Sequence, residues 1–192
     1  MARRRPYVER VPRQPRIQVA GGNYHVTTRG VRQSAIYRDD SDREIFLAVL
    51  GVVVSRRIWI CHSYVLMGNH YHLLVETPDP DIAAGMQFLN GFYAQYFNGR
   101  YGERGHVFDR RYASELIETD DYFAEVCRYI VLNPVRAGLC RHPAEWPWSS
   151  CSAILGERSV PEFLTIDWVL GLFGHDVARA RDAFRSYCEE PP

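Results

Sequence analysis

The sequence contains no lysine, so all 23 basic side chains of this 192-residue chain are arginines. A GC-rich genome that favours arginine codons explains this without reference to function. Arginine, however, also makes forked, bidentate contacts to phosphate that lysine cannot make. The absence of lysine therefore does not by itself distinguish codon bias from a role in phosphate binding.

Long apolar runs and paired cysteines are also missing. The longest apolar run, residues 45–54, is too short to span a bilayer. The basic N-terminus continues into Pro12, Arg13 and Pro15, where a signal peptide would need apolar residues. The five cysteines form no CxxC pair, which disfavours disulfides and a structural zinc site. We therefore expect a cytoplasmic protein that makes no contact with membranes.

The net charge is zero, but the charges are unevenly distributed. Residues 1–60 carry 12 Arg and 5 acidic residues, whereas residues 61–192 carry 11 Arg and 18 acidic residues. Six arginines and three prolines lie in residues 1–18, so residues 1–20 are predicted to form an extended basic arm that does not pack. Such an arm is either a solvated tail or a contact to nucleic acid.

Hydrophobic periodicity predicts one main domain in residues 21–145. Period-two alternation indicates strands, and apolar residues at three- to four-residue spacing indicate helices. Thr119 is a good N-cap, and Pro134 is expected to stop the following helix near Asn133. The expected elements are a strand at 24–31, a helix at 41–54, strands at 58–67 and 70–76, a helix at 81–97, a strand at 112–117 and a helix at 119–133.

The order of these elements predicts an α+β fold of the ferredoxin-like type, a βαββαβ antiparallel sheet with helices on one face. Residues 146–192 contain a Trp/Pro-rich segment and then helical patterns near 166–173 and 177–188. We expect them to form a C-terminal helical tail that packs on the main domain.

His70-Tyr71-His72 is the most chemically suggestive local motif. Side chains two residues apart on a strand point to the same face, so both imidazoles project together while Tyr71 faces the core. Two neutral imidazoles at this spacing can chelate one divalent ion. From the motif alone, a pair of half-exposed strand histidines is the more common explanation.

Tyr129 and Asn133 lie four residues apart and therefore share one face of the helix at 119–133. A tyrosine hydroxyl, with an ordinary pKa of about 10, becomes a useful nucleophile when a metal makes the target phosphate more electrophilic. An ordinary amphipathic helix with Asn133 at its C-terminus explains the same spacing. Tyr93, Tyr96, Tyr101, Tyr112 and Tyr122 are rival candidates, but Tyr129 has a polar partner one turn further on.

Several longer motifs carry a family resemblance. The runs YVLMGNHYHLLVETPDP, LNGFYAQYFNGRYGERGHVFDRRY, RYIVLNPVRAGL and EWPWSS occur in this order. Together they resemble the REP-associated tyrosine transposases, which belong to the His-hydrophobe-His (HUH) family of single-strand transposases. The resemblance extends from about residue 22 to residue 174.

The resemblance implies a metal-dependent enzyme that cuts and joins single-stranded DNA. By analogy with the family, His70, His72 and Asn133 would bind Mg²⁺ or Mn²⁺, and Tyr129 would attack a phosphodiester to give a 5′-phosphotyrosine. The substrate would be a REP-like palindrome that folds into a hairpin. The REP-associated branch implies a monomer, whereas relatives from simpler insertion elements are dimers.

DNA contacts are expected in two arginine-rich segments, the N-terminal arm and the loop around residues 98–112. The loop around residues 98–112 mixes arginines with aromatic residues, a composition suited to phosphate neutralisation and base stacking. Where the family often has Gly-Arg-Tyr-Lys, this chain has Arg110-Arg111-Tyr112-Ala113, which puts the lysine's phosphate contact in doubt. The candidate DNA-binding residues are Arg3, Arg4, Arg5, Arg100, Arg104, Arg110 and Arg111.

Two other functions fit the same residues. A non-catalytic regulator that binds hairpin DNA would bind in a salt-sensitive manner without needing metal or Tyr129. A metal-dependent nuclease that activates water would cut DNA without forming a covalent adduct.

Overall fold

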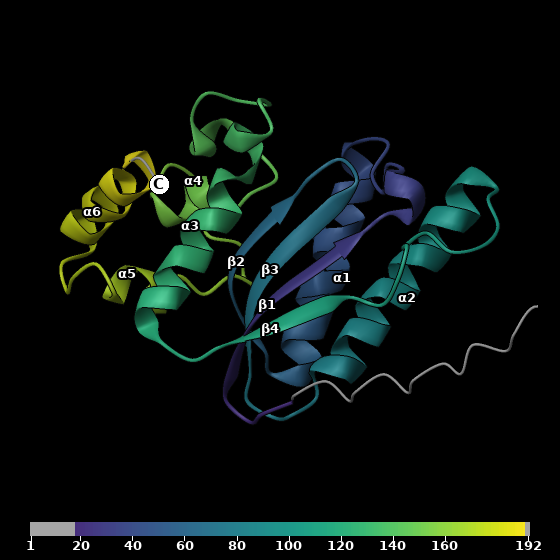
Figure 1. Cartoon of the computed structure of the whole chain (residues 1–192), viewed down its shortest axis with the longest axis horizontal. Helices are drawn as coiled ribbons and strands as arrows, with labels where there is room; N and C mark the ends of the chain where they lie inside the picture. Colours follow the sequence, from purple (N-terminus) through teal and green to yellow (C-terminus); the bar gives the residue numbers. More distant parts are fainter. Residues whose placement is uncertain (1–17, 191–192) are drawn as a thin grey trace, which may run out of the picture.

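The computed structural model describes residues 18–190 and contains a four-stranded antiparallel sheet in the order β2-β3-β1-β4 (Figure 1). The strands are β1 (Gly22–Arg29), β2 (Ile60–Leu66), β3 (His70–Thr77) and β4 (Ala113–Ile117). The main helices are α1 (Asp40–Arg57), α2 (Ile82–Tyr101) and α3 (Asp120–Arg136), and the C-terminal part contains α4 (Cys151–Ile154), α5 (Asp167–Gly171) and α6 (Val177–Glu189). The predicted ferredoxin-like α+β fold is confirmed.

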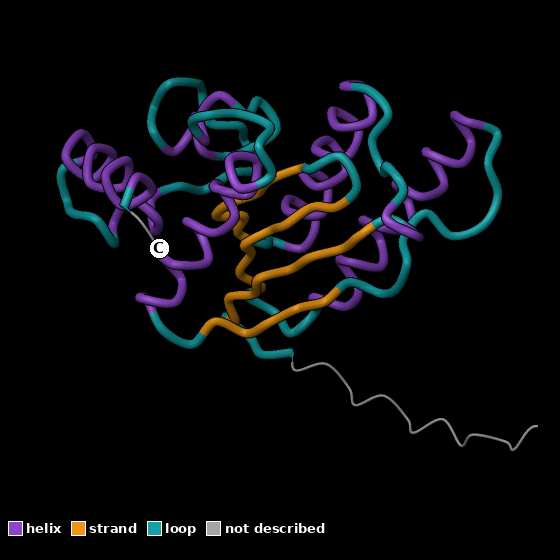
Figure 2. Tube along the Cα trace, turned by 45° about the horizontal axis from the view of Figure 1, so that its top comes forward, coloured by secondary structure: helices purple, strands orange, loops and turns teal. Residues whose placement is uncertain are grey.

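Helices α1 and α2 pack together against one face of the sheet (Figures 1 and 2). The Phe46 ring of α1 lies 4.6 Å from the ring of Tyr71 on β3. The Tyr71 hydroxyl in turn donates a hydrogen bond of 2.6 Å to Asn90 of α2. This face is therefore closed by the main apolar core, and the odd-numbered residues of β3 point into it.

Helix α3 covers part of the opposite face, a position that the strand-and-helix order alone did not specify. It begins at the predicted N-cap, because the Thr119 side chain accepts a hydrogen bond from the backbone N–H of Tyr122. Its buried residues recur at helical spacing and fix which side of the helix faces the sheet. They are Phe123, Val126, Cys127, Ile130, Val131 and Pro134.

The C-terminal segment packs on the domain along strand β2, which is an edge strand of the sheet. The backbone N–H of Leu66 donates to the carbonyl of Trp148, and that of Ser150 donates to the carbonyl of Tyr64. The Ser63 and Ser150 hydroxyls are 2.8 Å apart. This segment therefore satisfies backbone groups that an uncovered edge would leave open.

Several predicted boundaries differ from the structure, and two of these differences have a clear local reason. Pro134 does not stop α3, because it lies in the last turn, where its missing N–H removes one hydrogen bond, and the helix continues to Arg136. The second predicted strand does not begin at Ile58, which adopts a left-handed conformation (φ 56°) that ends α1. Strand β2 therefore begins at Ile60.

None of the described helices is long and apolar enough to cross a membrane.

Gly85 of α2 is required by the close approach of Trp59. A Cβ atom at Gly85 would lie 2.2 Å from Cζ2 of Trp59, whose indole N–H is held by Asp81 at 2.7 Å. We expect Gly85→Ala to destabilise the protein by about 1–3 kcal/mol through overpacking. Gly91→Ala, on the same helix with nothing within 4 Å of its Cβ, should instead be neutral or stabilise by up to about 1 kcal/mol. Urea unfolding of both variants tests this, and equal stabilities would contradict it.

His62 of β2 is buried under α3, with its ring 5.1 Å from that of Phe123. Burial lowers the pKa of His62 to about 4, although the nearby Thr165 backbone opposes the shift. The Glu76 carboxylate, at 3.6 Å, does not outweigh this burial. Because the folded state disfavours the proton, the stability contributed by neutral His62 is complete above about pH 6.5 and declines as the pH falls toward 4.

We therefore expect His62→Leu to flatten the acid side of the stability profile. The loss of unfolding free energy between about pH 6.5 and pH 4 should be smaller than in the wild type by up to about 3 kcal/mol. Urea unfolding at a series of pH values measures this loss. His175→Leu, at an exposed position, is the control and should leave the slope unchanged. Parallel profiles for the wild type and His62→Leu would show that His62 is not the titrating group.

Candidate active site

Strand β3 places His70 and His72 on the face opposite to the α1–α2 core, as the alternation of the strand predicts. Their ring centroids are 5.3 Å apart and the ring planes are nearly perpendicular. Across the β1–β3 ladder, Arg29 pairs with His70 and Thr27 pairs with His72. The two imidazoles therefore form the floor of a site that β1 flanks on one side.

Helix α3 places Tyr129 against the same two-histidine floor. The Tyr129 ring lies edge-on to His72, with 5.5 Å between the ring centroids, and 38% of the residue's surface is exposed. The guanidinium of Arg136 lies 5.1 Å from the centroid of the Tyr129 ring. Because His72 is almost fully buried while Tyr129 is open, a substrate can reach the phenol from solvent.

Asn133 follows Tyr129 by one helical turn and lies in the same pocket. Its side-chain amide N–H donates a 2.8 Å hydrogen bond to the backbone carbonyl of Tyr129. This contact uses the nitrogen end of the amide, so the oxygen end remains free to accept. The Asn133 side chain also lies near the His70 ring and raises the pKa of that imidazole slightly against the effect of burial.

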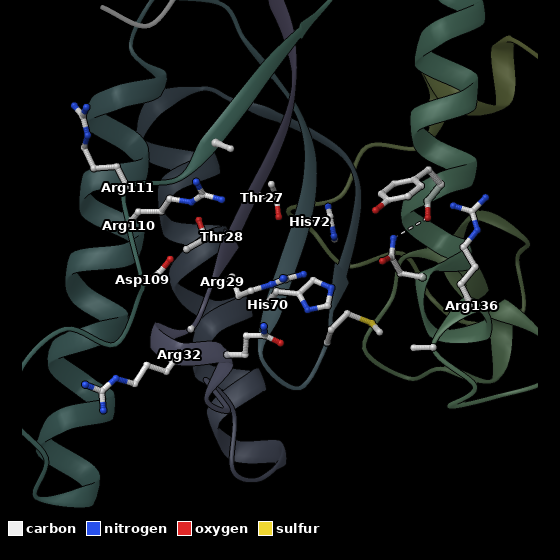
Figure 3. A pocket seen from close by; sticks show the side chains of 17 residues that line it. Thr27, Thr28, Arg29, Arg32, His70, His72, Asp109, Arg110, Arg111 and Arg136 are labelled. Carbon is white, nitrogen blue, oxygen red and sulfur yellow. Dashed lines mark hydrogen bonds between the residues drawn. The ribbon is translucent and has the colours of Figure 1, made fainter. Parts of the chain in front are cut away.

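These residues line one pocket of about 750 Å³ between β1, β3, the loop before β4 and α3 (Figure 3). Its walls carry five arginines and one acidic residue, Asp109. Arg29 and Arg110 extend toward the centre of the view, whereas Arg32 and Arg111 point outward. The lining arginines are Arg29, Arg32, Arg110, Arg111 and Arg136. The pocket is therefore suited to a polyanionic ligand.

Burial keeps the imidazoles of the site neutral. Burial, followed by the neighbouring His25, His70 and Arg29, lowers the pKa of His72 to about 3. Burial and then Arg29 lower the pKa of His70, and the nearby Asn133 side chain partly offsets this shift. Neutral imidazole is the form that binds metal ions, so no proton must be displaced from either ring at neutral pH.

The donor set fits a divalent cation with open coordination positions. It offers two neutral imidazoles and the side-chain oxygen of Asn133, which leaves room for substrate oxygens. Within residues 18–190, no three His, Cys, Asp or Glu residues lie together as a metal-binding group. The candidate site therefore depends on the amide of Asn133 as its third donor.

The structure separates the predicted DNA-binding arginines into groups. Arg110 and Arg111 line the pocket. Arg100 does not, because its guanidinium is paired with Asp39 and the buried Asp42, both at 2.6 Å. Arg104 is exposed and lies outside the pocket lining. Arg3, Arg4 and Arg5 lie outside the described residues.

The rival tyrosines do not line this pocket. Tyr93 is buried and donates to the backbone carbonyl of Ile36. The hydroxyls of Tyr96 and Tyr101 donate to Asp42, and that of Tyr122 donates to Glu115. Tyr112 is buried. Tyr129 alone of the predicted candidates shares the pocket with His70 and His72.

Sequence reasoning missed four residues around the site: His25, Arg29, Asn69 and Arg136. His25 and Arg29 belong to the alternating strand 24–31, but their position beside β3 depends on strand order and register. Asn69 falls in the short gap between two predicted strands, where no pattern indicates a site residue. Arg136 was missed because the helix was expected to end near Asn133.

Comparisons with known proteins identify relatives of this chain. The family model described as IS200-like transposase matches residues 18–133. A Haemophilus influenzae protein described as a REP-associated tyrosine transposase is 29% identical over 115 residues, which cover 54% of this chain and 62% of that relative. The solved structure of a REP-associated tyrosine transposase bound to a REP hairpin superposes with a TM-score of 0.65 at 18% identity, covering 87% of this chain and 93% of that one.

The fold and the pocket together define a class of protein. In it, a tyrosine on a helix faces two histidines that lie on a strand of the sheet. Because the family model spans more than half of the chain, the protein belongs to the IS200-like transposase family.

Proposed function

We propose that this protein is a metal-dependent single-strand DNA endonuclease and strand-transferase that acts on palindromic hairpin repeats. The observation that carries the proposal is the position of Tyr129, whose ring lies 5.5 Å from that of His72 in an arginine-lined pocket. The family match and the hairpin-bound structural neighbour support the substrate class.

The proposed reaction is a transesterification at Tyr129. A bond forms between the phenolic oxygen and the phosphorus, and the bond between phosphorus and the 3′ oxygen breaks. The phenolic proton is released and the departing 3′ oxygen gains a proton, which leaves a 5′-phosphotyrosine and a 3′-hydroxyl. Since the number of phosphodiester bonds is conserved, a 3′-hydroxyl can reverse the step without ATP.

His70, His72 and Asn133 would hold Mg²⁺ or Mn²⁺, which polarises the scissile phosphate and offsets its developing negative charge. The remaining contributions to the reaction come from arginine side chains and from the position of helix α3. Arg29 and Arg110 neutralise the backbone phosphates in the pocket, and α3 holds the Tyr129 phenol at its edge.

The geometry favours a monomeric enzyme. Tyr129 reaches the histidines of its own chain, so all four residues of the proposed site come from one copy. A second copy is not needed to supply the tyrosine helix. Light scattering of the purified protein, with and without a hairpin oligonucleotide, measures the mass in each state.

The nucleophile is tested by trapping a covalent adduct. With Mn²⁺ and a labelled hairpin oligonucleotide that carries single-stranded flanks, we expect a denaturation-resistant protein–DNA adduct. Tyr129→Phe should reduce adduct formation by at least about 10³-fold, because it removes the attacking oxygen. Tyr122→Phe, which removes a hydroxyl from the same helix, is the matched control and should retain it.

Three other outcomes would change the assignment. An undiminished adduct in Tyr129→Phe would show that another residue is the nucleophile. Metal-dependent cleavage without an adduct in the wild type would indicate a nuclease that activates water. Salt-sensitive hairpin binding without cleavage, unaffected by metal or by Tyr129, would indicate a non-catalytic DNA-binding regulator.

The role of the pocket arginines is tested by the salt dependence of DNA binding. Each lost phosphate contact should lower the slope of log K against log salt by about 1. We expect this change for Arg29→Ala and for Arg110→Ala, whose side chains line the pocket. Arg104→Ala, at an exposed position outside it, is the control. Equal slopes for all three variants and the wild type would contradict binding in this pocket.

A further inference from the structure

Each histidine of the proposed metal site has the same ring nitrogen engaged by a neighbour. Nδ1 of His70 lies 2.7 Å from the side-chain oxygen of Asn69. Nδ1 of His72 lies 2.8 Å from Nε2 of His25. Both contacts leave Nε2 as the ring nitrogen that is available for a metal ion.

The Asn69 contact fixes the tautomer of His70. The side-chain N–H of Asn69 donates to the backbone carbonyl of Gln33 at 3.1 Å, so its oxygen is the end that faces His70. An amide oxygen can only accept, and Nδ1 of neutral His70 must therefore carry the proton. Nε2 of His70 then holds the lone pair that a metal ligand needs.

A strained turn and a backbone hydrogen bond hold Asn69 in place. Gln33 adopts a left-handed conformation (φ 61°), as does Arg32 (φ 51°), which is uncommon for residues other than glycine. The backbone carbonyl of Asn69 accepts a 2.8 Å hydrogen bond from the N–H of Gly30. The segment between β1 and α1 is thereby fastened to the turn before β3.

His25 stands in the same relation to His72. It projects from β1 two residues before Thr27, which pairs with His72, and the two ring planes are only 22° apart with centroids 5.1 Å apart. The nitrogen–nitrogen contact needs one donor and one acceptor. If His72 presents a lone pair at Nε2, its Nδ1–H is the donor and Nε2 of His25 is the acceptor.

We propose that His25 is a positioning residue that holds His72 in the tautomer whose Nε2 binds the metal, as Asn69 does for His70. The proposal deepens the proposed function and rests on it. Partners of this kind fix the ring orientation and tautomer of a ligating histidine, and their loss typically weakens metal binding about 10- to 100-fold. His25 itself is not a ligand, because accepting at Nε2 leaves the proton of neutral His25 on Nδ1, so neither ring nitrogen offers a free lone pair.

The first experiment determines the tautomers in the metal-free wild-type protein. Two-bond ¹H–¹⁵N correlation spectra at about pH 8, above the ordinary imidazole pKa of about 6.5, distinguish protonated from unprotonated ring nitrogens. We expect His70 and His72 both to carry their proton on Nδ1. A proton on Nε2 of His72 would overturn the proposal, because His25 would then be the donor.

The second experiment measures Mn²⁺ affinity from the EPR signal of the free ion. His25→Leu removes the acceptor and should weaken binding about 10- to 100-fold. His25→Gln places an amide oxygen close to the lost nitrogen and should bind within about threefold of the wild type, a much smaller loss than that expected for His25→Leu. His175→Leu, at an exposed position, is the control. Thermal unfolding of each variant confirms that it is folded.

The outcomes distinguish this proposal from the proposed function. If the wild type binds Mn²⁺ and forms the Tyr129 adduct while His25→Leu binds the ion equally tightly, the role of His25 is overturned and the function stands. If the wild type binds no Mn²⁺, the metal-dependent function and the role of His25 both fail. Weak binding by His25→Leu that His25→Gln restores supports the proposal.

Discussion

The packing of α3 across the free face of the sheet is the constraint on which the site depends. Its buried stripe, which includes Phe123, Ile130 and Pro134, fixes the rotation of the helix over β2 and β3. Burying side chains of this size stabilises the packing by roughly 1.5–3 kcal/mol each. Tyr129 and Asn133 lie beside the stripe rather than within it, so the packing that holds the helix also presents them to His70 and His72.

The two faces of β3 have different surroundings, since one packs into the apolar core and the other lines the pocket. Tyr71 points into the α1–α2 core and is fully buried. His70 and His72 point the other way, into a pocket bordered by arginines. Burial lowers the pKa of both histidines, so their imidazoles are neutral at neutral pH. The positive charge of the pocket comes from the surrounding arginines, which attract phosphate groups.

The local patterns of the sequence predicted most of the fold. The alternation in β3 fixed the shared face of His70 and His72, and the helical spacing placed Tyr129 beside Asn133. The functional roles of these residues came from family resemblance rather than from spacing, since each pattern alone has an ordinary structural explanation. The position of α3 was not predictable from local patterns, because it depends on apolar contacts with β2 and β3 that are distant in sequence.

The parts that the sequence did not reveal depend on register and on local strain. His25 meets His72 because β1 pairs with β3 in one particular register, and a shift of one residue would turn His25 to the opposite face. The side-chain amide of Asn69 is oriented by its hydrogen bond to the carbonyl of Gln33, and no simple pattern indicates the left-handed conformation of Gln33. Arg100 has the right chemistry for DNA, but Asp39 and Asp42 already pair with it.

The most direct test of the central claim is the anomalous difference map of a crystal soaked in Mn²⁺. The account predicts one strong peak bounded by Nε2 of His70, Nε2 of His72 and the side-chain oxygen of Asn133, with the Tyr129 phenol at the edge of the same pocket. A map with no peak there, or with the ion bound at another site while the pocket is accessible, would contradict it.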